Sequence, residues 1–212
     1  MDADAVEIRV LGCLVEKQRT TPDVYPLSLN SLRLACNQTT NRDPVVEYDE
    51  TTIRSAVERL SRKGWIRLAS GAGSRAAKYR HLLDEAIGVG GPEISVLAVL
   101  MLRGPQTPGE LKQRTERLHP FASLDEVEAV LGGLVERELV VHLERRPGQK
   151  EARYGQLLGG DNEAAVVESA VHDGDEVPTD RISALEQRVA HLEEALAALQ
   201  SSAAGPDDLS GA

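Results

Sequence analysis

Residues 54–80 contain eight basic residues and a single acidic residue. The acidic residue is Glu58, and the basic residues are Arg54, Arg59, Arg62, Lys63, Arg67, Arg75, Lys78 and Arg80. Arginine can hold a phosphate or a guanine edge with two hydrogen bonds, because its guanidinium group is a planar fork of donors. The stretch therefore predicts binding to a polyanion such as double-stranded DNA. The alternative is a charged surface that meets only solvent.

A helix must carry the first of these side chains. Asp49 is a suitable N-cap, and Ile53, Val57 and Leu60 recur with helical spacing up to a stop at Gly64. The face opposite this apolar stripe holds the predicted DNA contacts of the helix, which are Arg54, Ser55, Arg59, Arg62 and Lys63. In a winged helix this face would enter the major groove.

A hairpin must carry the remaining basic residues. Residues 65–68 and 77–82 favour two strands, and the glycine-rich segment 70–74 favours a turn between them. Arg67, Arg75, Lys78 and Arg80 would then lie along a wing that contacts the phosphate backbone.

The helix and hairpin are repeated: residues 50–82 correspond to residues 124–157. Each copy follows two further helical segments, so we expect a mainly α fold with small β-hairpin wings (α+β), made of two tandem winged helix-turn-helix domains. The expected domains are residues 1–87 and 88–158. An acidic disordered linker at 159–179, a coiled-coil-like helix at 180–201 and a disordered tail at 202–212 complete the chain.

The second copy differs from the first in charge. Its helix shows an acidic, glycine-containing face made of Asp125, Glu128, Ala129, Gly132, Gly133 and Glu136. Acids would repel phosphates, so we do not expect this helix to contact DNA; its glycines suit close contact with another protein. Basic residues nearby offer further phosphate contacts or are simply solvated: Lys112, Arg114, Arg117, Arg145, Arg146, Lys150 and Arg153.

The end of the chain predicts self-association. Residues 159–212 contain twelve acidic and two basic residues, so the whole net charge of −10 resides there and residues 1–158 are neutral. A heptad pattern follows the acidic segment, formed by Ile182, Leu185, Val189, Leu192, Leu196 and Leu199. β-Branched residues at one core position and leucine at the other favour a parallel pair, so a homodimer through this helix and the second domain is one prediction. A single amphipathic helix is the alternative.

Other functions find little support in the sequence. No catalytic motif occurs and the five histidines are scattered, so we do not expect an enzyme. Cys13 and Cys36 lie in apolar helical patterns and no metal-ligand spacing is present, so no metal or other cofactor is expected. No segment resembles a signal peptide or a membrane span, which predicts a cytoplasmic protein without membrane contact.

Several motifs resemble the YceH-like family of bacterial proteins. They include residues 11–18, 21–30, 35–38, 41–45 and 102–111. The resemblance implies a tandem winged-helix fold but confers little function. Its most recognisable stretch, residues 37–44, contains Asn37, Asn41 and Arg42, which either contact phosphate or a partner or only shape a turn.

The leading expectation is a DNA-binding protein, in particular a transcriptional regulator, that uses the helix and wing of its first domain. The rival expectation is an adaptor or scaffold for protein–protein interactions, since tandem winged helices also serve in that way.

Overall fold

The computed structural model describes residues 2–69, 77–143 and 151–159, which belong to one compact unit. Its first half, in chain order, consists of α1 (Ala5–Thr20), η1 (Pro22–Val24), β1 (Leu27–Ser28), α2 (Leu29–Cys36), α3 (Glu50–Arg62), β2 (Ile66–Leu68), β3 (Lys78–His81) and α4 (Leu83–Ile87). The second half consists of α5 (Gly91–Arg103), α6 (Pro108–Thr115), α7 (Leu124–Glu136), β4 (Val140–Leu143) and β5 (Arg153–Gln156). The expectation of a mainly helical α+β fold with small antiparallel sheets is confirmed. The boundary expected between residues 87 and 88 falls in the connection between α4 and α5.

Polar side chains cap the starts of α3 and α7. Asp49 caps α3 as expected, because its carboxylate accepts a hydrogen bond from the Thr52 backbone at 2.7 Å. Ser123 caps α7 by accepting from the Glu126 backbone at 3.2 Å. The Glu126 carboxylate binds the Ala122 N–H at 2.8 Å, one residue earlier than the reciprocal bond of a capping box.

Each half contains a small antiparallel sheet. The first has the strand order β1-β3-β2, and the second pairs β4 with β5. The two-residue strand β1 was not expected; it pairs Leu27 with Tyr79. The second half has a matching bridge between Gln106 and Tyr154, so the repeat extends further than the helix and hairpin.

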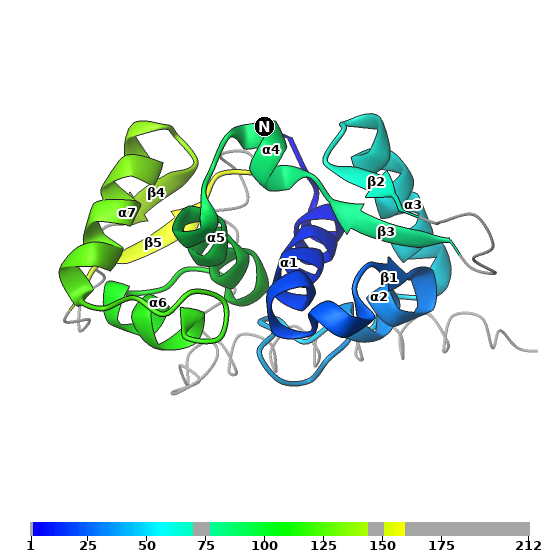
Figure 1. Cartoon of the computed structure of the whole chain (residues 1–212), viewed down its shortest axis with the longest axis horizontal. Helices are drawn as coiled ribbons and strands as arrows, with labels where there is room; N and C mark the ends of the chain where they lie inside the picture. Colours follow the sequence, from blue (N-terminus) through cyan, green and yellow to red (C-terminus); the bar gives the residue numbers. More distant parts are fainter. Residues whose placement is uncertain (1, 70–76, 144–150, 160–212) are drawn as a thin grey trace, which may run out of the picture. The chain divides into compact units, whose positions relative to one another are not determined.

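The two halves share a core along α1 and α5. These helices lie side by side in the middle of the described residues, with α3 and α7 on opposite outer sides (Figure 1). Gly12 permits the close approach, because a Cβ at this position would lie 2.8 Å from Leu102 Cγ. The Asp43 N–H also donates to the Leu102 carbonyl across the junction at 2.8 Å.

Some expectations lie outside the described residues. They concern Arg75, the second hairpin turn with Arg145, Arg146 and Lys150, the acidic linker apart from Gly159, the heptad helix and the final tail. Among the described helices, none combines the length and apolar character needed to cross a bilayer.

Candidate functional site

The polar and basic residues of helix α3 differ in how far they are exposed to solvent. Arg54 and Arg62 are exposed, whereas Ser55 and Arg59 are partly buried beside them. The buried stripe of the helix holds Ile53, Ala56, Val57 and Leu60, as its spacing predicts. The helix thus anchors itself through this stripe and turns the remaining face outward.

The basic residues nearest α1 are engaged by acids at the start of that helix. Arg59 contacts Asp4 at 2.5 Å and Glu7 at 3.4 Å, and Lys63 contacts Glu7 at 2.8 Å. Glu7 is buried, so these pairs belong to the packing of α3 on α1. Removing either cation would leave a buried carboxylate with fewer partners.

The other basic residues of α3 are more readily available to a ligand. Arg54 pairs with Glu50 one turn earlier, and both side chains are more than half exposed. Exposed pairs at this spacing contribute only about 0.3–0.5 kcal/mol, so a phosphate can displace the carboxylate. Within the described residues Arg62 forms no ion pair and bonds only to the Glu58 carbonyl, at 3.4 Å.

The hairpin concentrates positive charge on one face. Arg67 of β2 and Arg80 of β3 are directly opposite each other in the antiparallel register. Like charges in such a pair are destabilising unless an anion lies between or beside them. Arg80 has one carboxylate neighbour, Glu85 at 3.5 Å, and Arg67 forms no ion pair with any described residue. Lys78 is exposed at the start of β3.

The three polar residues of the segment after α2 have different environments. The Asn37 side chain exchanges two hydrogen bonds with the Tyr48 backbone, at 2.8 and 3.0 Å. Arg42 is buried and donates to Glu16, Gln38 and the carbonyls of Ala35 and Asn41. Both arrangements favour the structural alternative. Asn41 is exposed, has a φ of 60° and accepts a hydrogen bond from Arg103.

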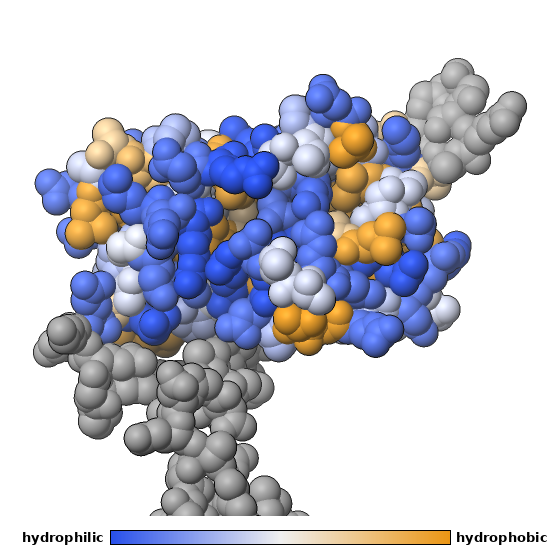
Figure 2. Space-filling model, turned by 90° about the horizontal axis from the view of Figure 1, so that it is seen from below, coloured by the Kyte–Doolittle hydropathy of each residue, from blue (hydrophilic) through white to orange (hydrophobic). Residues whose placement is uncertain are grey.

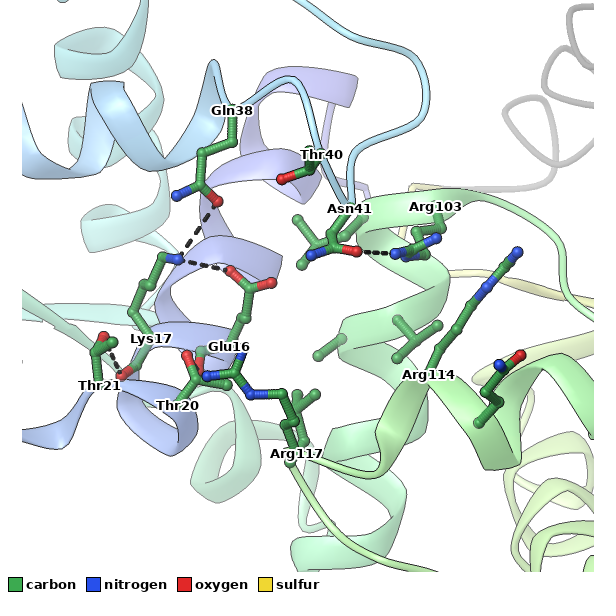
Figure 3. Close-up of a pocket in the computed structure, with 15 residues that line it drawn as sticks. Glu16, Lys17, Thr20, Thr21, Gln38, Thr40, Asn41, Arg103, Arg114 and Arg117 are labelled. Carbon is green, nitrogen blue, oxygen red and sulfur yellow. Dashed lines mark hydrogen bonds and ion pairs between the residues drawn. The ribbon is translucent and has the colours of Figure 1, made fainter.

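A pocket of about 590 Å³ lies where this segment meets the second half. The end of α1, the segment after α2, helix α5 and the region of α6 contribute its walls (Figure 3). Its charged lining residues are Glu16, Lys17, Arg103, Arg114 and Arg117. Sequence reasoning noticed Arg114 and Arg117 but missed their convergence with Lys17 and Arg103, because no local pattern reports which residues meet across a domain junction.

Residues 3–149 match the family described as "Protein of unknown function, DUF480". The chain belongs to this family. A relative named UPF0502 protein in Pelobacter propionicus is 51% identical over 202 residues, covering 92% of this chain and 91% of the relative. Relatives with the same name in Serratia proteamaculans (45% identical over 205 residues, covering 93% and 95%) and Geobacter sulfurreducens (47% over 194 residues, covering 88% of each) are similar along most of their length. The resemblance inferred from the motifs is confirmed.

Helix α7 presents the other distinctive surface of this family member. Gly132 and Gly133 are exposed in the middle of the helix, and a Cβ at either position would meet nothing within 4 Å. Packing among the described residues therefore does not require glycine at either position. Asp125, Glu128 and Glu136 make the same face acidic, as expected.

The face seen from below in Figure 2 is mainly hydrophilic, with hydrophobic residues in separate patches. The exposed large hydrophobic residues of the described chain are likewise spread over several elements: Val24, Leu34, Val45, Leu68, Leu124 and Val135. Such scatter is usual for protein surfaces. Charge is therefore the property that distinguishes the α3 surface and the pocket.

Proposed function

We propose that the protein is a cytoplasmic DNA-binding regulator with two tandem winged-helix domains, acting as a homodimer. The arrangement of α1, α2, α3 and the β2–β3 hairpin supports this, since three helices followed by a wing are the elements of that fold. The exposed face of α3 would enter the major groove, and the hairpin would follow the phosphate backbone.

The opposed pair of Arg67 and Arg80 is the observation that carries the proposal. Within the described residues Glu85 is the one carboxylate paired with these two facing cations. An external anion would stabilise them further, and a phosphate backbone supplies a row of anions. Arg54 and Arg62 extend this surface along α3. Arg59 and Lys63, which are engaged by Asp4 and Glu7, would hold α3 in place more than contact DNA.

The salt dependence of DNA affinity tests the proposal. Log affinity for duplex DNA should fall linearly with log salt, with a slope of about −0.9 per phosphate contact. Arg62→Ala combined with Arg67→Ala should make the slope less steep by about 2. A control with Arg19→Ala and Arg137→Ala removes the same charge from exposed positions outside the candidate DNA contacts and should keep the wild-type slope.

Two results would overturn the proposal: no affinity for duplex DNA at low salt, or equal slopes in the two double variants. Helix α7 supports a second candidate function, that of a protein-interaction adaptor. Its exposed Gly132 and Gly133 leave room for close approach of another backbone. Failure of duplex binding, with a partner protein lost on Gly132→Leu, would favour that function.

A further inference from the structure

The pocket between the two halves has no role in the proposed contact of α3 and the hairpin with DNA. Its volume of about 590 Å³ lies within the range of roughly 300–1,000 Å³ found for small-molecule sites. Lys17 and the nearby Gln38 stand on one side of the open space, Asn41 and Arg103 on another, and Arg114 and Arg117 complete the ring (Figure 3). The lining thus comes from four separate segments of the chain.

The charge of this pocket is positive. Four cationic residues line it (Lys17, Arg103, Arg114 and Arg117), and Glu16 is the one acidic residue among them. The Glu16 carboxylate is already bound by Arg42, through contacts of 3.1 and 2.6 Å, and by Lys17 at 3.3 Å. Little negative charge is left for the three lining arginines.

The arginines of the pocket have weak or neutral partners. Arg103 donates to the amide oxygen of Asn41, and Arg114 is 3.5 Å from Glu110. Arg117 is exposed and forms no ion pair with any described residue. Burial and the positive charges of Arg114 and Arg42 lower the pKa of Arg103 and outweigh the opposite effect of Glu16 and Asp43, so positive charge is in excess around this guanidinium group. An anion in the pocket would relieve this repulsion.

The remaining lining residues suit an organic ligand more than a free ion. Ala98, Val99, Leu102 and Leu118 provide an apolar part. Uncharged polar groups surround it, namely Thr20, Thr21, Gln38, Thr40, Asn41 and Gln113. Donors of this kind fix the orientation of a ligand, while apolar contacts hold its carbon skeleton.

We infer that this pocket binds a small organic anion with more than one negative charge, carried by phosphoryl or carboxylate groups. Arg103 and Arg117 contact its charged groups, and the apolar residues of α5 contact its carbon atoms. The ligand joins α1 and the segment after α2 to α5 and α6, so it stabilises the packing of the two halves. This inference does not depend on the proposed DNA binding.

Calorimetric titration and thermal unfolding of the full chain test the inference. Pyrophosphate and citrate serve as the probes. Sodium chloride at equal ionic strength is the control for non-specific salt effects. One of the two probes should bind saturably and raise the unfolding temperature, because a ligand selective for the folded state stabilises it. Binding of pyrophosphate alone would identify a phosphoryl ligand, and binding of citrate alone a carboxylate ligand.

Variants locate the binding. Arg117→Gln and Arg103→Gln should each weaken the binding about tenfold or more, since each removes a charge-assisted hydrogen bond. Lys112→Gln removes a charge from α6 outside the pocket lining and should retain wild-type affinity. Arg117 is exposed, so its variant remains informative if Arg103→Gln does not fold.

Three results would overturn the inference. The first is the absence of saturable binding of either probe at millimolar concentration. The second is an equal loss of affinity in Lys112→Gln and Arg117→Gln. The third is an effect of Arg117→Gln on duplex DNA binding without any effect on small anions, which would make the pocket part of a nucleic-acid surface.

Discussion

Arg42 shows how a single side chain can hold several segments together. Its guanidinium group binds Glu16 of α1 and the carbonyl of Ala35 at the end of α2. The side chain is fully buried, while that of Glu16 is 13% exposed. Burial alone would raise the pKa of Glu16, but hydrogen bonds and charge attraction from Arg42 and Lys17 outweigh it and lower this pKa. The pair therefore behaves as part of the core.

Arg42→Ala should destabilise the protein by about 3–5 kcal/mol, because it leaves Glu16 and the carbonyls of Ala35 and Asn41 without their partner. Urea unfolding measures the change. Arg62→Ala, which removes an exposed arginine bonded only within α3, should cost less than about 0.5 kcal/mol. A loss in Arg42→Ala no larger than this control would contradict the structural role of the pair.

His81 makes stability depend on pH. Burial lowers its pKa, and the positive charges of Arg19 and Arg80 add to this effect, whereas Asp84 and Glu85 oppose it. The unfolded chain then binds the proton more readily, so the contribution to stability is complete above about pH 6.5 and is lost as the pH falls below that value.

The urea midpoint of the wild type should therefore decrease between pH 8 and pH 5.5. His81→Gln should show a smaller decrease, whereas His142→Gln, which changes an exposed histidine of β4, should follow the wild type. If the profiles of His81→Gln and the wild type are parallel, His81 is not the titrating group.

At the scale of the elements, sequence patterns predicted the long helices and the repeated helix-plus-hairpin. Apolar periodicity marks α3 and α7 clearly because each buries one stripe. Strand β1 was not predicted because a segment of two residues is too short to show an alternating pattern. Its pairing of Leu27 with Tyr79 makes it a strand. The repeat of Tyr79 at Tyr154 was visible in the sequence, but the strand partner that each tyrosine would find was not.

The glycines of α1 and α7 should respond oppositely to alanine. Gly132→Ala should stabilise the protein by up to about 1 kcal/mol, because alanine favours a helix and the new methyl group has open space. Gly12→Ala should destabilise it by about 1–3 kcal/mol, since the methyl group would lie against Leu102. Thermal unfolding of both variants measures this. An unfolding temperature of Gly12→Ala equal to or above that of the wild type would show that the close approach of α1 and α5 does not require Gly12.

At the scale of the whole molecule, the surface of α3 and the pocket both depend on contacts between residues that are far apart in the sequence. The sequence predicted the basic side chains of α3 and the hairpin, because they are close together in the chain. It did not show that Arg59 and Lys63 would meet Asp4 and Glu7, some 55 residues earlier. Local sequence patterns could not predict the pocket either, because Lys17 and Arg114 belong to different halves of the chain and line it together.

The shared core of α1 and α5 predicts that both halves unfold together. Trp65 is the single tryptophan and lies in the first half, so its fluorescence reports that half, whereas far-UV circular dichroism reports the helices of both. Leu134→Ala empties a buried position of α7 and should cost about 2–5 kcal/mol. If the halves are one cooperative unit, the Trp65 transition moves by the same amount as the circular dichroism transition. An unchanged Trp65 transition with a two-step circular dichroism curve would instead mean that the halves unfold separately, and that the α1–α5 contact contributes little to either.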